Sequence, residues 1–463
     1  MEKTTLITNG LVVTETGTYP LDLLVRGQRI VALGRELPRT GVDRVIDATG
    51  MFVLPGVVDP HVHIQLDTGI YRTDDDWEIG TRVAAFGGVT TVVDFATQFP
   101  GQDVREAVQN RHDEVDHKAL VDYGLHVMLT DLPEEDDQLE AWMRDLVTLG
   151  TPAAKIYTTY RPNYYQDDAA LMRVFRAAAR TGVLVMVHAE NDAIVTYHTQ
   201  KLVREGKTSL TYHAQARPPL AEAEAVRRVL YLAHEAQCPV YIVHCSTDAA
   251  VEAIHKAKQE GQTAYAELCP QYLLLDDSAY EGPHPEWVIM QPPLRPAPIV
   301  QQQWKNLEMG KVDALGTDHC DYSIAQKTAT GNFTNTPGGI PGLETALPLM
   351  ATYAVLRGSM DWHELMRLMS TRPAQLFGLY PRKGTLLPGS DADIVLYDPR
   401  GTRRIHARDL HGVSGYTPYE GMEVDGRVYL TMVRGRVVVE DGELTGTPGW
   451  GVFVPGTAGA WPR

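Results

Sequence analysis

The sequence predicts an α/β protein in which a closed (β/α)8 barrel of the TIM type carries a small β-sandwich domain formed by both chain ends. Eight short, apolar, β-branched segments alternate with helical patterns between residues 56 and 319. The first fifty residues contain strand-like runs joined by glycine turns, and strand-like runs return after about residue 382. With 463 residues, the chain has a length that suits such a barrel with additions.

The two chain ends share the composition of β-strands. In residues 1–54, "TLITNGLVVT" contains the tight-turn pair Asn9-Gly10, and "LDLLVRGQRIVALG" contains a turn at Gly27. Residues 384–445 contain "GSDADIVLYDP" and "EVDGRVYLTMVRGRVVVEDGEL". We therefore assign both ranges to one β-sandwich domain. Residues 446–463 are rich in glycine and proline, which predicts an irregular C-terminal arm against the body or a neighbouring subunit.

Residues 55–383 are assigned to the barrel. Its predicted strands are residues 56–63, 89–95, 123–130, 153–159, 183–190, 239–246, 263–270 and 312–319. Segments between them, such as "DDAALMRVFRAAARTG", repeat apolar residues at helical spacing. An open doubly wound sheet is the alternative, but no G-x-G-x-x-G motif follows the first strand. Eight strand–helix alternations favour the closed barrel.

Charge and composition exclude several classes of function. The net charge of −17 gives a surface that repels phosphate backbones and anionic membranes, so nucleic acid is not expected as a partner. No run of 18 apolar residues is present, so no membrane span is expected. The N-terminal residues lack the pattern of a secretory signal, and the four cysteines show no C-x-x-C spacing. These observations predict a cytoplasmic protein.

Polar side chains stand in five of the eight predicted strands, at the strand end in four of them and inside an otherwise apolar run in the fourth strand. They are His61, His63, Lys155, His188, His244 and Asp318. Taken singly, a histidine at a strand end is more often a hydrogen-bonded core residue, Lys155 would extend outward, and Asp318 would cap a helix. The carboxyl ends of barrel strands converge on one mouth, however, and unrelated packing residues have no reason to gather there. Imidazoles with a carboxylate suit zinc and similar divalent metals.

The motifs along the chain resemble those of one enzyme family. In order, they are "GVVDPHVH", "KIYTTY", "VMVHAEND", "YIVHCS", "AELCPQYLLL", "PPLR", "GTDHC" and "FGLYPRKGTLLPGSDADIVLYDP". Together they are similar to the dihydropyrimidinase/hydantoinase branch of the cyclic amidohydrolases, and they cover nearly the whole chain. The resemblance implies a metal-dependent hydrolase that opens the ring of a dihydropyrimidine or a 5-substituted hydantoin, and it implies a homotetramer.

The resemblance also implies a centre of two divalent metal ions, usually Zn²⁺, bridged by an N6-carboxylated lysine. Carried over motif by motif, the ligands of the more buried metal are His61, His63 and Asp318, those of the more exposed metal are His188 and His244, and the bridge is Lys155. A hydroxide bridging the metals would attack the ring carbonyl. Asp318 would take its proton and pass it to the departing nitrogen. Tyr160 would donate to the developing oxyanion, although outside this motif it would be a surface loop tyrosine.

Substrate recognition is where the sequence departs from the family pattern. Gln291 precedes "PPLR", where many hydantoinases have serine or threonine, and Gly338 stands where many have asparagine. Those family contacts to the substrate imide are largely made by backbone groups. Leu66 and Tyr157 would line the ring substituent. Allantoinase-like activity is the alternative within the class. A scaffold without activity is the alternative outside it, and the complete ligand set argues against that scaffold.

Dihydroorotases typically carry an arginine two residues after the second histidine of the H-x-H motif. Here Gln65 holds that position, so the cation that would pair with a substrate carboxylate is missing. We therefore expect a neutral cyclic imide as the substrate, with poor activity on dihydroorotate.

Overall fold

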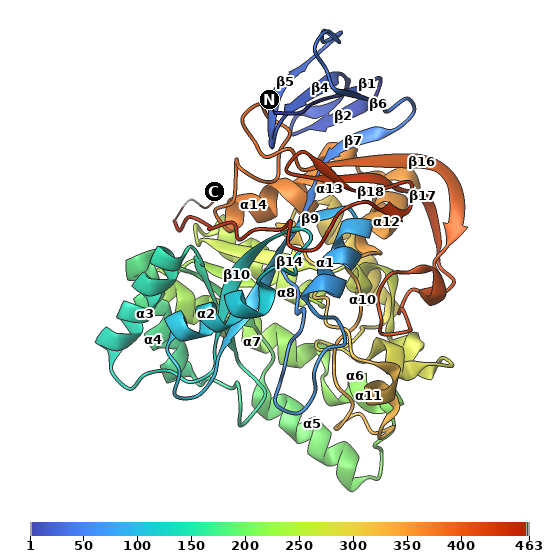
Figure 1. Cartoon of the computed structure of the whole chain (residues 1–463). Helices are drawn as coiled ribbons and strands as arrows, with labels where there is room; N and C mark the ends of the chain where they lie inside the picture. The colour runs from blue at the N-terminus through green and yellow to red at the C-terminus, as the bar shows by residue number, and fades with distance from the viewer. Residues whose placement is uncertain (1, 460, 462–463) are drawn as a thin grey trace.

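The computed structural model describes residues 2–459 and 461, and its centre is a parallel sheet of eight strands in the order β8 to β15 (Figure 1). The strands are β8 (Val57–Asp59), β9 (Val89–Gln98), β10 (Asp122–Leu129), β11 (Ala153–Tyr157), β12 (Leu184–His188), β13 (Val240–Ile242), β14 (Ala264–Leu268) and β15 (Ala314–Leu315). A parallel bridge between Val62 and His319 joins the chain beyond the first and last strands. The sheet is therefore a nearly closed barrel, which confirms the predicted fold class.

Several strands are shorter than the apolar runs that predicted them. The run at 239–246 gives only β13, and the run at 312–319 gives only β15. The backbone beyond these strands bends sharply, since His244 and Asp318 have φ angles of 39° and 53°. Left-handed backbone of this kind cannot continue a strand.

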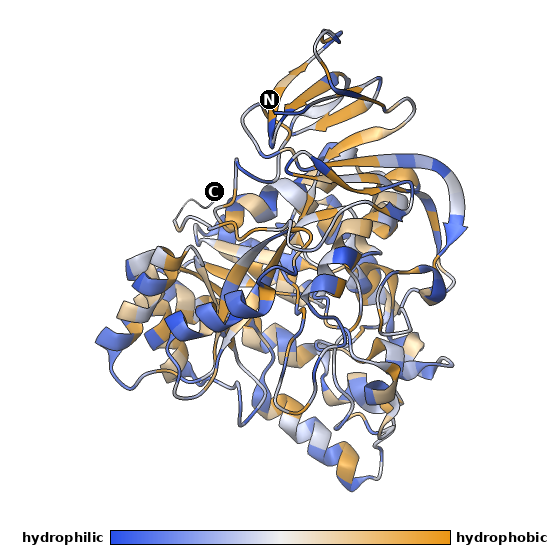
Figure 2. Cartoon of the chain, in the orientation of Figure 1, coloured by the Kyte–Doolittle hydropathy of each residue, from blue (hydrophilic) through white to orange (hydrophobic). Residues whose placement is uncertain are grey.

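Long helices follow the strands and cover the outside of the barrel (Figure 1). They are α1 (Trp77–Phe86), α2 (Val104–Val115), α3 (Asp136–Leu149), α4 (Asp168–Thr181), α5 (Asp192–Arg204), α7 (Pro219–Glu235), α8 (Asp248–Gln259) and α10 (Ala297–Glu308). Aspartate caps three of them: Asp76, Asp103 and Asp167 accept hydrogen bonds from backbone N–H groups of the first turn. Figure 2 shows apolar barrel strands and helices with mixed surfaces, as expected for one buried face.

Short helical turns fill the connections around the mouth of the barrel and after β15. They are α6 (His213–Ala216), α9 (Gln271–Leu274), α11 (Ile324–Thr328), α12 (Ala346–Met350), α13 (Trp362–Met366) and α14 (Arg372–Leu376), with η1 (Leu210–Tyr212), η2 (Asp277–Glu281), η3 (Pro285–Val288), η4 (Ala351–Leu356), η5 (Arg367–Thr371) and η6 (Ala407–Asp409). Within the described residues, no helix has the length and apolarity to cross a membrane.

Strands from both chain ends lie together in sheets beside the barrel. A four-stranded sheet has the order β5 (Arg29–Gly34), β4 (Asp22–Arg26), β1 (Thr4–Thr8), β6 (Arg44–Asp47). A seven-stranded sheet has the order β19 (Glu443–Leu444), β18 (Arg436–Glu440), β17 (Glu423–Val433), β16 (Ile394–Arg404), β7 (Phe52–Pro55), β2 (Leu11–Thr14), β3 (Gly17–Pro20). The antiparallel pairing of β7 with β16 joins the two ends. The predicted domain boundaries at 54/55 and 383/384 stay predictions.

The described part of the C-terminal arm runs along the body of its own chain. The N–H of Tyr123 donates to the carbonyl of Val452 at 3.0 Å, and the N–H of Val454 donates to the carbonyl of Tyr123 at 2.8 Å. Further along, the N–H of Gly456 donates to the carbonyl of Gly150 at 2.8 Å. These bonds tie the arm to the start of β10 and to the turn after α3.

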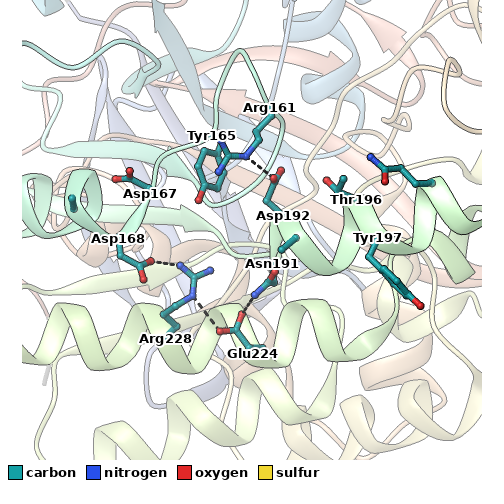
Figure 3. A pocket seen from close by; sticks show the side chains of 13 residues that line it. Arg161, Tyr165, Asp167, Asp168, Asn191, Asp192, Thr196, Tyr197, Glu224 and Arg228 are labelled. Carbon is teal, nitrogen blue, oxygen red and sulfur yellow. Dashed lines mark hydrogen bonds and ion pairs between the residues drawn. The ribbon is translucent and has the colours of Figure 1, made fainter.

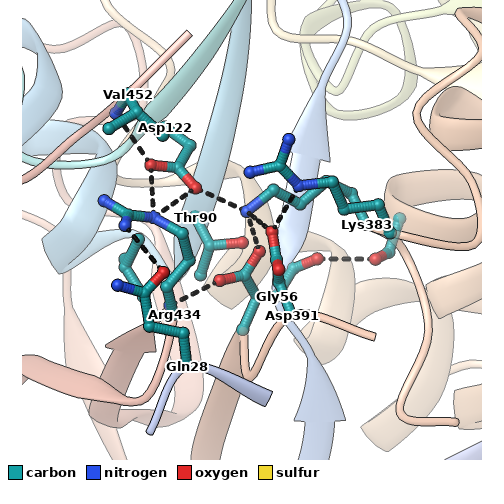
Figure 4. A network of polar contacts seen from close by, with 12 residues as sticks. Gln28, Gly56, Thr90, Asp122, Lys383, Asp391, Arg434 and Val452 are labelled. Carbon is teal, nitrogen blue, oxygen red and sulfur yellow. Dashed lines mark hydrogen bonds and ion pairs between the residues drawn. The ribbon is translucent and has the colours of Figure 1, made fainter. Parts of the chain in front are cut away.

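A buried ion network connects the barrel with the sheets of the chain ends (Figure 4). The Lys383 ammonium lies 2.5 Å from Asp122 at the start of β10, 2.6 Å from Asp393 and 3.1 Å from Asp391. The Arg434 guanidinium, just after β17, lies 2.9 Å from the same Asp122 carboxylate. Burial alone would lower the pKa of Lys383, but the three carboxylates raise it above its ordinary value.

Candidate active site

The chain segments that follow β8 and β15 are fastened to each other at the barrel mouth. The Asp59 carboxylate accepts hydrogen bonds from the N–H of His61 at 3.1 Å and from the N–H of Thr317 at 3.2 Å. Two residues after His61, the N–H of His63 donates to the carbonyl of His319 at 2.7 Å. These bonds hold His61 and His63 beside the loop that carries Asp318.

A first group of predicted ligands forms around Asp318. One carboxylate oxygen of Asp318 lies 3.2 Å from Nε2 of His61 and 3.4 Å from Nε2 of His63. The three ligand atoms lie within 4.8 Å of one another, as a shared cation requires. The Nζ of Lys155, at the centre of β11, lies 3.2 Å from Nε2 of His61. The structure thus brings together four of the six predicted metal-centre residues.

His188 and His244 form a second group. Nδ1 of His188, the last residue of β12, lies 2.9 Å from Nε2 of His244. The rings of His61 and His244 are stacked with their centroids 5.5 Å apart, which places the two groups side by side. All six predicted residues therefore gather at one end of the barrel, and the arrangement is compatible with a binuclear metal site.

Two buried glutamates orient these histidines, and the sequence analysis assigned no role to either. Glu267, inside β14, lies with Oε1 2.7 Å from Nδ1 of His61 and accepts from the N–H of His244 at 2.8 Å. Glu190 lies with Oε2 2.8 Å from Nε2 of His188, and Arg217 donates to Glu190 in turn. A carboxylate on one ring nitrogen leaves the lone pair of the other nitrogen free for a metal. An acid within an apolar strand was the available signal for Glu267.

Burial controls the protonation of the site. Burial and the nearby Lys155 lower the pKa of His61 well below its ordinary value, and burial with neighbouring imidazoles does the same to His244. Burial also lowers the pKa of Lys155 to about 8, against the opposing effect of Asp318. Burial alone would raise the pKa of Asp318, but His61 and His63 bring it below its ordinary value. Neutral imidazoles beside an ionised carboxylate form a donor set for a cation.

Three of the predicted residues occupy strained backbone. Tyr160, His244 and Asp318 have φ angles of 75°, 39° and 53°, in the region that residues with a Cβ rarely enter. Such conformations persist where the surrounding structure enforces them, and they cluster at functional sites. In this chain all three lie two or three residues beyond a barrel strand, after β11, β13 and β15.

The predicted aromatic residues lie next to the second group of histidines. The ring centroid of Tyr160 is 4.9 Å from that of His188. The Arg217 guanidinium lies 5.1 Å from the Tyr160 ring centroid. Burial raises the pKa of Tyr160 above its ordinary value, so the hydroxyl keeps its proton. Tyr157 packs 5.7 Å from His188, and Leu66 joins both tyrosines in one apolar cluster. Tyr160 therefore belongs to the site and is no isolated surface tyrosine.

The two residues that depart from the family pattern touch each other. A Cβ atom on Gly338 would lie 1.6 Å from Oε1 of Gln291, so the Gln291 side chain fills the space in front of Gly338. The chain around Gly338 also borders the loop that carries Asp318, because the N–H of Cys320 donates to the carbonyl of Ile340 at 3.0 Å.

A further buried cluster, around His319, supports the loop that carries Asp318. Nε2 of His319 lies 3.1 Å from Asp75, and Nδ1 of His319 accepts a hydrogen bond from the N–H of Gly342 at 3.0 Å. Because Nδ1 is the acceptor, Nε2 carries the proton and donates it to Asp75. His319 therefore supports the loop through hydrogen bonds, as is usual for a single buried histidine.

A large surface hollow lies outside the ligand cluster (Figure 3). Its volume is about 890 Å³, and it opens between α4, α5 and α7. Figure 3 shows paired charges on its walls, with Arg161 2.8 Å from Asp192 and Arg228 3.2 Å from Glu224. Among the described residues, none of the six predicted ligands lines it. The hollow borders the site through lining residues next to it, such as Arg161 and Asn191, the chain neighbours of Tyr160 and Glu190, and Tyr165, which forms a β-bridge with Tyr157.

Comparisons with known proteins agree with this geometry. Residues 52–438 match the amidohydrolase family. A D-hydantoinase of Geobacillus stearothermophilus is 39% identical over 455 residues, which cover 97% of this chain and 96% of the relative. A D-phenylhydantoinase of Escherichia coli is 36% identical and covers 97% of each chain. The crystal structure of a dihydropyrimidinase from Brevibacillus agri superposes with a TM-score of 0.95, at 36% identity and full coverage of both chains.

The barrel, the ligand cluster and these matches define the class: the chain belongs to the amidohydrolase family. Within that class, it is a cyclic amidohydrolase of the dihydropyrimidinase/hydantoinase family, as the motifs predicted.

Proposed function

We propose that this enzyme opens the ring of dihydropyrimidines or 5-substituted hydantoins by hydrolysing one cyclic amide bond. The observation that carries the proposal is the buried cluster of four imidazoles, one lysine and one carboxylate at a single barrel end. The named activities of relatives that cover 97% of this chain support the choice of substrate.

We propose two Zn²⁺ ions as the cofactor. His61, His63 and Asp318 would hold one ion, and His188 and His244 the other. The donor set fits such a group, because Glu267 and Glu190 commit one nitrogen each of His61 and His188 and leave the other nitrogens facing the cluster. Metal ions held there would supply Lewis-acid chemistry, polarising the amide carbonyl and lowering the pKa of water.

Lys155 would serve as a carboxylated bridge between the two ions. Its pKa of about 8, lowered by burial, leaves a share of neutral amine at neutral pH. A neutral amine can add to carbon dioxide, which forms a carbamate and releases one proton. The carbamate is an anion with two oxygen donors, whereas an ammonium group among cations would repel them.

Asp318 and Tyr160 would carry the proton transfers and the charge stabilisation. Asp318, held ionised by its histidine neighbours, accepts a proton from the water that attacks the ring carbonyl. It then gives that proton to the ring nitrogen as the C–N bond breaks, so that the products are a carboxylic acid and an amide or ureido group. Tyr160 keeps its hydroxyl proton and would donate it in a hydrogen bond to the carbonyl oxygen as negative charge develops.

A hydrolysis assay with parallel metal analysis tests this function. Dihydrouracil, a 5-substituted hydantoin, allantoin and dihydroorotate are compared with the protein stripped of metal and reloaded with Zn²⁺. We expect turnover of the first two substrates only after reloading, with about two metal ions per chain. Absence of turnover on all four compounds by fully loaded protein would contradict the proposal, and a preference for allantoin would favour the allantoinase-like alternative.

We also propose a cytoplasmic homotetramer. The support is the family resemblance together with four buried cysteines that form no disulfide among the described residues. Light scattering on the purified protein would give the mass of four chains, and cell fractionation would place the activity in the cytoplasm.

A further inference from the structure

Arg217 lies in the connection between α6 and α7, and its side chain contacts two parts of the candidate site. One guanidinium nitrogen donates to Oε2 of Glu190, the same oxygen that lies 2.8 Å from Nε2 of His188. The guanidinium also lies 5.1 Å from the ring centroid of Tyr160. One cation therefore contacts both the carboxylate beside a predicted metal ligand and the ring of the predicted oxyanion donor.

The main chain of Arg217 is tied to a third connection of the barrel. Its carbonyl accepts a hydrogen bond from Nη1 of the buried Arg295 at 2.5 Å. Nε of Arg295 donates at 2.8 Å to Oγ of Ser246, two residues after His244. Through its side chain and its carbonyl, Arg217 thus joins the connections that follow β11, β12 and β13.

Glu190 depends on Arg217 for its charge balance. Glu190 and His188 are both buried, and within the described part of the chain Arg217 is the one arginine or lysine that forms an ion pair with Glu190. A buried carboxylate that loses its cation is strongly disfavoured. The ion pair therefore holds Glu190 as the anion whose Oε2 contacts the His188 ring.

The ring of Tyr160 is held by contacts from outside its own connection. Its backbone has a φ of 75°, a region that tyrosine rarely adopts, and its ring lies beside those of His188 and the Arg217 guanidinium. A guanidinium is attracted to an aromatic ring, and its planar shape allows close packing there. An oxyanion donor has to be held within about 0.5 Å of its productive position.

We propose that Arg217 is a positioning residue for two groups of the reaction. Through Glu190 it fixes the ring of His188, so that Nδ1, the other ring nitrogen, can hold a metal ion. Through its contact with the ring it fixes Tyr160, so that the hydroxyl meets the carbonyl oxygen of the substrate. In this role Arg217 itself contacts neither the metal nor the substrate. The proposal rests on the proposed function, but its effect on metal affinity is measured without turnover.

Arg217→Lys separates the two contacts. Lysine keeps a cation for Glu190, but its ammonium is a compact point charge without the planar face of a guanidinium. Arg217→Met removes both contacts. Arg227, an exposed arginine of α7, supplies the matched controls Arg227→Lys and Arg227→Met. Affinity for Zn²⁺ is measured by competition with a chelator, and kcat and KM for dihydrouracil are measured at saturating Zn²⁺.

We expect Arg217→Met to lower Zn²⁺ affinity about tenfold and kcat about tenfold, with KM within about twofold of the native value. Arg217→Lys keeps Zn²⁺ affinity within about threefold, whereas its kcat falls about fivefold. A role confined to structure would lower Tm and the fraction of active protein without this separation of affinity from kcat. Both Arg227 variants keep the native values.

Double variants assign each effect to its contact. Tyr160→Phe keeps the ring and lacks the hydroxyl, so adding Arg217→Lys to it should change kcat less than about twofold. Glu190→Gln removes the charge with which Arg217 pairs. Adding Arg217→Met to Glu190→Gln should therefore change Zn²⁺ affinity less than about twofold.

An undiminished effect of Arg217→Lys on kcat in the Tyr160→Phe background would overturn the positioning of Tyr160. Native Zn²⁺ affinity in Arg217→Met would overturn the link through Glu190. If Arg217→Met does not fold, Arg217→Gln takes its place in the affinity comparison. If the Zn²⁺-loaded native protein hydrolyses no cyclic amide, the proposed function fails separately, and the Zn²⁺ affinities of the same variants decide the role of Arg217.

Discussion

Nδ1 of His61 lies 2.7 Å from Oε1 of Glu267, and both side chains are completely buried. Glu267 also accepts from the Tyr241 hydroxyl at 2.8 Å and from the N–H of His244 at 2.8 Å. One carboxylate therefore fixes the ring of His61, a predicted ligand after the first barrel strand, and the backbone of His244, a predicted ligand after the sixth. It joins the two halves of the cluster.

Glu267→Gln should weaken metal binding more than it weakens the fold. Glutamine replaces the anionic carboxylate by a neutral carboxamide with a single acceptor oxygen, so the bond that fixes the tautomer and orientation of His61 weakens. We expect metal affinity to fall about 10- to 100-fold, measured by competition with a chelator. Glu260→Gln, on the exposed end of α8, is the control and should bind metal normally. Native affinity in Glu267→Gln would remove the orienting role.

Lys155→Ala should remove the bridge and most of the bound metal. Lys155 is 1% exposed and lies between ligand strands, where a cation has no structural use. We expect activity to fall by several orders of magnitude and added short carboxylic acids to restore part of it by replacing the carbamate. Metal analysis and turnover are measured on the same samples. Normal metal content with normal turnover would end the binuclear proposal.

Asp318→Asn should lose catalysis more completely than fold. Asparagine tolerates the left-handed backbone at residue 318, where φ is 53°, so the loop keeps its shape. An amide can neither accept nor return the proton, and we expect kcat to fall at least about 100-fold. Far-ultraviolet circular dichroism monitors the fold in parallel. Turnover near the native value would make Asp318 a ligand only and would require another base.

The predicted metal-centre residues could be singled out because they are polar residues in or just after short apolar runs: His61 and His63 end the first run, and Lys155 lies inside the fourth. The barrel then brings His61 and Asp318 together by topology alone, without any contact that must be guessed. Glu267 was not predictable in its role, since a buried acid is explained only by its donors. His61, 206 residues away in the chain, is one of them. Patterns of local periodicity carry no information about such pairs.

The contact between Gln291 and Gly338 escaped prediction for a related reason. Both residues lie in irregular connections, where no strand or helix period fixes which side chains face each other. The sequence marked each position as unusual, but only the structure shows that one side chain occupies the space left by the other. The fold class, by contrast, followed from the eightfold alternation itself.

Lys383→Met should destabilise the protein strongly. The substitution leaves Asp122, Asp391 and Asp393 around an apolar side chain in the network of Figure 4. Arg434 still pairs with Asp122, and Arg29 and Arg382 still pair with Asp391, but no cation among the described residues is left beside Asp393 at the centre. Removal of one partner from a buried ionic network costs about 3–5 kcal/mol. Urea unfolding measures the loss. Lys207→Met, which removes an exposed pair with Glu205 at 2.8 Å, should cost less than about 1 kcal/mol. Equal costs would mean that the network contributes nothing beyond a surface pair.

The last prediction concerns substrates with a carboxylate on the ring. Gln65, at the position where dihydroorotases carry arginine, offers no charge. The guanidinium of Arg111 donates to the carbonyl of Gln65 at 3.3 Å. Arg111 is already paired with Asp94, its Nε lying 3.0 Å from the carboxylate. On the other side of Tyr160, Arg217 is paired with Glu190.

A substrate carboxylate would therefore be desolvated without a free cation from either arginine, which is costly. We expect kcat/KM for dihydroorotate to lie at least about 100-fold below that for dihydrouracil under identical Zn²⁺ loading. The buried Lys327 is a further candidate, since among the described residues its ammonium donates to the carbonyl of Ile289 and pairs with no carboxylate, and burial lowers its pKa to about 7. A preference for dihydroorotate that Lys327→Met abolishes would show that this lysine supplies the cation and that the argument from Gln65 is wrong.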